Sequence, residues 1–233
     1  MEALMKTVEL FEAGHSRAWA YLEKTTYPWE ILSDIADVIR EIGPGLDAQV
    51  YDNPSEGIWI AKSAKVAPTA SISAPCIIGE NTEVRPGAFI RGSALVGDNC
   101  VVGNSTELKN VILSDNVQVP HYNYVGDSVL GYKSHMGAGS ITSNVKSDKS
   151  QVIVKPTPAC NGDAMFTPIE TGRKKFGAIL GDFVEVGCNS VLNPGTVVGA
   201  HSNIYPLSSV RGVVPPHAIL KSGQGSRVVA KND

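Results

Sequence analysis

The sequence predicts an all-β solenoid, a left-handed parallel β-helix built from hexapeptide repeats, and two observations carry that prediction. First, an aliphatic residue recurs at every sixth position over two long runs. The runs are Ile60, Val66, Ile72, Ile78, Val84, Ile90, Val96, Val102, Leu108 and then Leu180, Val186, Leu192, Val198, Ile204, Val210. Second, the residue four places later is usually small, as at Ala64, Ala70 and Cys76. A coil of three short flat strands requires this pattern, because the aliphatic residue packs inward near a corner and only a small residue fits beside it.

Composition adds limits on function. The chain has 233 residues, 42% of them hydrophobic, and a formal net charge of -3, which is typical of a soluble protein. With 20 basic and 23 acidic residues, the chain has no large excess of positive charge with which to bind nucleic acid. No apolar run approaches the ~18 residues of a membrane span, and the N-terminus lacks the pattern of a signal peptide. We therefore expect a cytoplasmic protein with neither nucleic-acid nor membrane partners.

The four cysteines form no close pair in sequence, so neither a disulfide framework nor a zinc knuckle is indicated. Cys76 and Cys100 occupy the small inward position of their repeats. We expect both to be buried as small hydrophobic residues.

The sequence predicts a helical N-terminal cap and linker over residues 1–57. Leu4, Val8 and Phe11 repeat at helical spacing, and a stronger pattern follows between Pro28 and Gly43. Its apolar positions are Trp29, Leu32, Ile35, Ile39 and Ile42. Proline suits a first helical turn and glycine suits a stop. Since a solenoid needs its open ends covered, we interpret these helices as a cap or a trimer-side appendage.

Residues 58–216 predict the β-helix and residues 217–233 a C-terminal tail. After Leu108 the period slips by one residue, and it slips again before Leu130, so two turns are one residue short. A long loop insertion then breaks the period at about 143–177, with many lysine, glycine and proline residues. Insertions in repeat proteins emerge as loops on one side, often the binding side.

Two basic residues point to the middle of the coil. Arg91 and Lys109 are eighteen residues apart, which is one full turn, so they should stack in adjacent coils about 4.8 Å apart. Two cations at that distance repel unless an anion lies between them. A carboxylate such as Glu107 and a bound phosphate both satisfy this requirement, and the spacing does not choose between them.

His121 lies in the segment Val-Pro-His-Tyr-Asn-Tyr-Val-Gly-Asp, residues 119–127. An imidazole can take a proton from an amine or a hydroxyl as that group attacks a carbonyl, and Tyr124 could orient it or bind substrate. The alternative is a surface or packing histidine.

Several short sequence motifs follow one another between residues 85 and 182. They are Arg-Pro-Gly-Ala at 85–88, Val-Gly-Asn at 102–104, Glu-Leu-Lys at 107–109, His121 with Tyr124, Val-Gly-Asp at 125–127, Gly-Ala-Gly-Ser-Ile-Thr-Ser-Asn at 137–144, and Ile-Leu-Gly-Asp at 179–182. This stretch resembles the acetyltransferase domain of the bifunctional N-acetylglucosamine-1-phosphate uridyltransferase/glucosamine-1-phosphate acetyltransferases. It also resembles archaeal sugar-1-phosphate nucleotidyltransferase/acetyltransferases. The resemblance covers roughly residues 70–215.

The resemblance implies an acetyl-CoA-dependent N-acetyltransferase acting on a phosphorylated amino sugar, with no catalytic metal. His121 would be the general base. Arg91, Lys109, Tyr124 and Asn144 would hold the sugar phosphate, and His135 stands where the bacterial enzymes carry an asparagine that helps hold the amino sugar. Ala138 and Cys188 fall where the family contacts acetyl-CoA, and Cys188 replaces a serine. Family members are homotrimers.

Departures from the family keep other classes open. The family's N-terminal nucleotidyltransferase domain has no counterpart here, so uridyl transfer is not predicted. One alternative is a non-catalytic trimeric scaffold or sugar-phosphate-binding protein. Another is a metalloenzyme of the γ-carbonic-anhydrase type, which needs three histidines converging on zinc. His121, His135 and His201 are too widely spaced in sequence to favour it.

Overall fold

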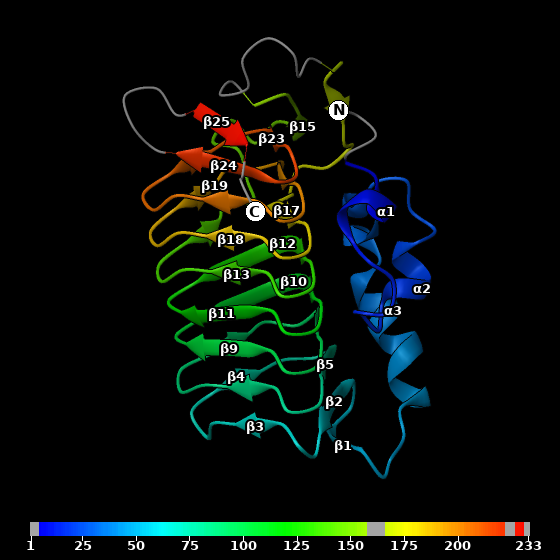
Figure 1. Ribbon diagram of the computed structural model, residues 1–233. Coiled ribbons are helices and arrows are strands. Elements are labelled where there is room, and N and C mark those ends of the chain that lie inside the picture. The colour runs from blue at the N-terminus through cyan, green and yellow to red at the C-terminus, as the bar shows by residue number, and fades with distance from the viewer. Residues whose placement is uncertain (1–4, 158–165, 222–226, 231–233) are drawn as a thin grey trace.

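The computed structural model describes residues 5–157, 166–221 and 227–230, and it confirms the β-helix. Successive coils stack in parallel with three faces, and the N-terminal helices lie along one side (Figure 1). Leu4 and Cys160 lie outside the described residues. Within the described part, no helix is long and apolar enough to cross a membrane.

Each coil contributes strands to three faces. The first face contains β2 (Ile58–Ala61), β5 (Cys76–Ile78), β8 (Ala94–Val96), the ends of β10 (Glu107–Leu113) and β12 (Tyr124–Leu130), β17 (Ala178–Leu180), β20 (Thr196–Val198) and β23 (Val213–Val214). The second face contains β3 (Lys65–Val66), β6 (Glu83–Val84), β9 (Val101–Asn104), β11 (Gln118–His121), β13 (His135–Met136), β18 (Glu185–Val186), β21 (Asn203–Ile204) and β24 (Ala218–Lys221). The third face contains β4 (Ser71–Ile72), β7 (Phe89–Ile90), the beginnings of β10 and β12, β14 (Ile141–Thr142), β19 (Val191–Leu192) and β22 (Ser209–Val210).

The inward positions form one continuous core. The predicted aliphatic residues from Ile78 to Val210 are buried in it, and Cys76 and Cys100 are 0% and 1% exposed, as expected. Burial raises the pKa of the Cys76 thiol to about 12, so that thiol stays protonated.

The two short turns are confirmed by strand register. Gln118 pairs with Val101 on one side and with His135 on the other, so each of these turns holds 17 residues. At this level β10 and β12 continue from the third face into the first without a break. Lys109 pairs with Gly126 near their beginnings, and Val111 pairs with Ser128 after the corner.

The N-terminal segment covers the first face. It contains α1 (Thr7–Leu10), α2 (Trp19–Leu22), two 3-10 helices (Pro28–Ser33 and Gly43–Gly45), α3 (Ile35–Ile42) and β1 (Tyr51–Ser55), which pairs antiparallel with β2. The helices lie along the side of the solenoid and not over an open end (Figure 1), so of the two interpretations offered for this segment they are not an end cap. Pro28 begins a 3-10 helix, and Gly43 follows the end of α3. A Cβ on Gly43 would lie 2.4 Å from the Trp59 indole, so only glycine allows this close approach.

The N-terminal helices and the outer side of the first face form a second hydrophobic core. On the first face, the residue just before each inward aliphatic residue points outward and is itself apolar. These outward residues are Ile77, Leu95, Ile112, Val129, Ile179, Val197 and Val213, each at most 2% exposed. They pack with Trp29, Leu32, Ile35 and Ile39 of the helices. The equivalent outward positions of the second face are mostly polar, for example Lys65, Glu83, Gln118 and Glu185.

The insertion and the C-terminus add antiparallel pairs. In the insertion, β15 (Ile153–Val154) pairs with β16 (Ile169–Glu170), while Val152 and Phe176 are buried in the second core. β25 (Arg227–Ala230) pairs antiparallel with β24.

A buried carboxylate ties the N-terminal segment to the coil. Asp182 is 3% exposed, and its two oxygens accept N–H groups from Tyr132 and Glu12, each at 2.7 Å. Its own N–H donates to the Leu10 carbonyl at 3.0 Å. Burial raises the pKa of this carboxyl to about 6, although the two N–H donors oppose the shift.

The raised pKa predicts a pH-dependent stability. Since the folded state binds this proton more tightly than the unfolded state, the stabilisation is present below pH ~4 and is lost as pH rises towards ~6. We expect a decrease of about 2 to 3 kcal/mol in the free energy of unfolding over that interval, and Asp182→Asn should remove it. Denaturant titrations at several pH values measure this slope.

Asp148→Asn is the matched control, because hydrogen bonds from Ser150 lower the pKa of that exposed carboxyl. This control should retain the wild-type decrease between pH ~4 and ~6. An Asp182→Asn protein with the wild-type slope would show that Asp182 does not carry the effect.

Candidate active site at the corner between the second and third faces

Arg91 and Lys109 lie one above the other on the third face, as their spacing predicts. Their neighbours Ile90 and Leu108 pair directly between β7 and β10. Arg91 Nη1 donates to Glu107 Oε1 at 2.7 Å, and this hydrogen bond raises the pKa of the Arg91 guanidinium. Lys109 Nζ lies 3.3 Å from Asp127 Oδ2. Each cation therefore has a carboxylate partner within the chain.

The two ion pairs differ in exposure. The side chains of Arg91 and Glu107 are 44% and 32% exposed, so solvent screens their attraction. Asp127, by contrast, is 6% exposed and accepts hydrogen bonds from Lys109, Asn110 and Asn144. The Arg91 pair is therefore the easier one for a ligand to displace.

Asp127 joins three of the predicted sugar-phosphate-binding residues, Lys109, Tyr124 and Asn144, into one network. Asn144 Nδ2 donates to Asp127 and also lies 3.2 Å from Tyr124 Oη, whose pKa is raised by burial. We call Lys109, Tyr124, Asp127 and Asn144 the Asp127 network. In the sequence, Asp127 stood out only as the last residue of a Val-Gly-Asp motif. Asp127 lies one turn after Asn110, the residue that follows Lys109, and this spacing is the signal that could have identified it.

His121 begins a second group at the adjacent corner. It ends β11 opposite Asn104, it is exposed, and its carbonyl accepts the Gly139 N–H at 3.0 Å. Since His135 pairs with Gln118 and with Glu185, the same register places Ala138 and Cys188 in line with His121 in the next two coils. Successive members are about 4.8 Å apart. We call His121, Ala138 and Cys188 the His121 column.

The corner is held rigid by Asn123, which is 2% exposed. Its Oδ1 accepts the His121 N–H at 3.0 Å, and its Nδ2 donates to the carbonyls of Gly137 and Ser140 at 2.9 and 3.0 Å. These bonds fix the backbone of His121 relative to the next coil. Tyr124 follows Asn123 directly and begins the third-face strand β12. The His121 column and the Asp127 network are therefore neighbours across one corner.

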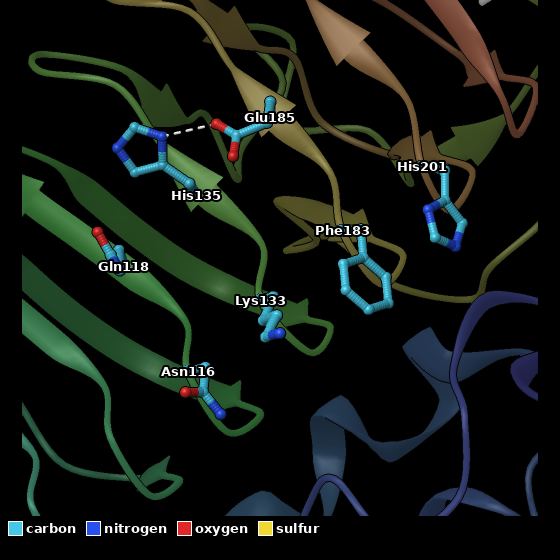
Figure 2. Close-up of a pocket in the computed structure, with 7 residues that line it drawn as sticks. All are labelled: Asn116, Gln118, Lys133, His135, Phe183, Glu185 and His201. Atoms are coloured by element: carbon cyan, nitrogen blue, oxygen red, sulfur yellow. Dashed lines mark hydrogen bonds and ion pairs between the residues drawn. The ribbon is translucent and has the colours of Figure 1, made fainter. Parts of the chain in front are cut away.

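His135 lies apart from the Asp127 network. It projects from the second face, where its Nδ1 is 2.8 Å from Glu185 Oε2 (Figure 2). The two residues line an open pocket of about 550 Å³. The remaining lining residues are Asn116, Gln118, Lys133, Phe183 and His201. Because outward side chains on the second and third faces diverge, one chain does not bring His135 to Arg91, Lys109, Tyr124 or Asn144.

The histidines considered for zinc binding are dispersed. His201 stacks on Phe183 and on His217 at the corner between the first and second faces, with ring centroids 4.6 and 4.9 Å apart. His121 lies at a different corner. Among residues 5–157, 166–221 and 227–230, no three His, Cys, Asp or Glu side chains are grouped to hold a metal ion.

Comparison with known proteins shows which family the chain belongs to. Residues 72–205 match the family described as the GMPPB C-terminal domain, which is more than half of the chain. The chain belongs to this family. The matched range contains the whole His121 column and the whole Asp127 network.

Two relatives carry informative names. The "Bifunctional protein GlmU" of Methanococcus maripaludis is 31% identical over 205 residues, which are 87% of this chain and 48% of that protein. The "Bifunctional sugar-1-phosphate nucleotidylyltransferase/acetyltransferase" of Sulfurisphaera tokodaii is 31% identical over 121 residues, 52% of this chain and 28% of that protein. The chain thus spans about half or less of the length of these relatives.

Among solved structures, the UDP-N-acetylglucosamine acyltransferase of Francisella novicida is similar, with a TM-score of 0.47 and 16% identity. The match covers 76% of this chain and 68% of the other.

The different burial of the two ion pairs gives a matched stability test. Lys109→Met leaves the buried Asp127 carboxylate with one donor fewer and should lower the free energy of unfolding by about 1 to 3 kcal/mol. Arg91→Met removes only a half-exposed pair that solvent screens, so it should lower the free energy of unfolding less than Lys109→Met does. Urea unfolding of both variants measures the difference, and equal losses would contradict the assignment of Asp127 as the centre of the network.

Proposed function

We propose that the protein is an acetyl-CoA-dependent N-acetyltransferase that acts on the amine of a phosphorylated amino sugar. The observation that carries the proposal is the adjacency of an exposed imidazole, His121, to the Asp127 network across a rigid corner. The names of the relatives support the same class of reaction and substrate. Each part of the site has a separate task.

His121 acts as the general base. As the sugar nitrogen attacks the thioester carbonyl, a C–N bond forms and the C–S bond breaks. The imidazole takes the proton that the nitrogen releases, and the leaving thiolate is protonated to free CoA. Ala138 and Cys188 lie one and two coils from His121, and they contact the thioester end of the cosubstrate.

Arg91 and Lys109 bind the phosphate, and Tyr124 and Asn144 bind the sugar. The exposed Arg91–Glu107 pair contributes little to stability, so Arg91 can turn to a phosphate and form two parallel hydrogen bonds with it. Lys109 remains tied to Asp127 and supplies a point charge from a fixed position. Because Arg91 turns to the phosphate while Lys109 stays paired with Asp127, one site can contain both a carboxylate network and a bound anion.

The active form is a homotrimer in which a neighbouring second face completes the site. The helices occupy the first face, which leaves the second and third faces for contacts between subunits. Large apolar side chains are exposed near the corner between these two faces: Phe89, Tyr122, Tyr205 and Leu207. Tyr122 and Leu207 are 65% and 74% exposed, which is typical of an interaction surface. In this arrangement His135 of one subunit reaches the amino sugar held by the next.

Replacing His121 tests the chemistry. With acetyl-CoA and a panel of amino sugar phosphates, free thiol should appear with the wild-type protein. His121→Ala should lower kcat by ~10² to 10⁴, while calorimetry shows that acetyl-CoA still binds. His217→Ala, which replaces an exposed histidine outside the pocket of His135, is the control and should turn over normally. Unchanged turnover in His121→Ala would rule out its role as the base, and no thiol release with any acceptor would favour the scaffold function.

Light scattering tests the assembly. Three chains of 24.7 kDa should give a species of about 74 kDa. Leu207→Glu should dissociate it, because a charge would be buried in the apolar contact. Val8→Glu is a matched control, since Val8 is 62% exposed on the N-terminal segment. A wild-type monomer with full activity would contradict the shared site.

A further inference from the structure

The insertion builds a fixed wall against the last coils. Val152 and Val154 are fully buried in the second core, so the alternation of an extended segment turns Ile153 and Lys155 away from that core. The Lys155 carbonyl accepts the Val213 N–H at 3.1 Å. At Gly212, which has a φ of +77°, a Cβ would lie 2.4 Å from that carbonyl oxygen. The backbone of Lys155 is therefore held tightly beside the coil.

This contact encloses a small basic pocket of about 230 Å³. Its lining residues are Lys146, Ile153, Lys155, Pro156, Pro194, Arg211 and Gly212. Three of them are cationic and none is acidic. Lys146 is partly compensated by Asp148, at 3.7 Å. In the part of the chain that the structure describes, neither Lys155 nor Arg211 takes part in an ion pair.

Arg211 has a defined relation to the candidate active site. It follows Val210 on the third face, and strand register places it in the same position of its coil as Lys109, four coils away. At about 4.8 Å per coil, the two residues are roughly 19 Å apart. The pocket thus lies on the same side of the solenoid as the Asp127 network, shares no residue with it, and extends from Lys146, two residues after Asn144, to Arg211.

We propose that the pocket formed by Lys146, Lys155 and Arg211 binds a phosphate group. Three cations around one small space repel one another unless an anion lies between them. The guanidinium of Arg211 matches phosphate through two parallel hydrogen bonds, and the lysines add point charges. Pro156, Pro194 and Ile153 supply apolar walls that reduce screening by water. This site goes beyond the transferase site, and it does not depend on turnover there.

Pyrophosphate is a suitable probe, with binding measured by isothermal titration calorimetry at low ionic strength. We expect Lys155→Gln and Arg211→Gln each to weaken its binding by roughly 5-fold to 10-fold, since each removes a charge-assisted contact. Lys65→Gln, which removes an exposed lysine from the first coil, is the matched control and should bind as the wild type does. Thermal unfolding of each variant checks that the fold is retained.

The result that overturns the proposal is an absence of pyrophosphate binding, or equal binding by wild type and both pocket variants. A second series distinguishes two sources of the phosphate. If the pocket variants also lose affinity for CoA by a similar factor but not for its phosphate-free pantetheine portion, the pocket holds the phosphates of the cosubstrate. If CoA affinity is unchanged while pyrophosphate affinity falls, the pocket holds a separate phosphate ligand. Both series measure binding alone, so they remain informative if acetyl transfer is not observed.

Discussion

The parallel register between coils is the constraint on which the rest of the structure depends. Buried aliphatic residues fix where each corner falls, and the backbone ladder then places equivalent positions of adjacent coils about 4.8 Å apart. Sequence separation thereby becomes spatial adjacency. His121 and Ala138 are neighbours because one short turn separates them, and Ala138 and Cys188 are neighbours because the insertion leaves the coil and returns in register.

The same constraint gives the three faces different uses. Outward residues on the first face are apolar in coil after coil, and the helices bury them. The second and third faces keep polar and basic residues beside a corner with exposed aromatic and aliphatic side chains. A solenoid with one covered face has only the other two available for ligands and for further copies of itself. The proposed shared site uses both, since His135 and the Asp127 network project from different faces.

Periodicity made much of this predictable. The burial of Cys76 and Cys100, the short turns and the stacking of Arg91 on Lys109 all follow from counting residues, because register is local and repetitive. The sequence did not decide whether the helices cap an end or lie along a side, since an amphipathic pattern shows that a face is buried but not what it is buried against. The apolar residues that precede each inward residue on the first face, such as Ile77 and Leu95, were the available signal. The role of Asp127 depends on donors from the coils on both sides of it, Lys109 and Asn110 from the preceding coil and Asn144 from the following one, and a linear pattern does not reveal such convergence.

Subunit complementation tests the central claim, a site shared between two faces of neighbouring subunits, most directly. His121→Ala and His135→Ala chains with different affinity tags can be coexpressed, and mixed trimers purified through both tags. Each variant alone should have little activity. Every mixed trimer should contain one interface with both histidines intact, so its thiol release should recover to about one third of the wild-type rate. Mixed trimers no more active than the two parent variants would contradict the shared site.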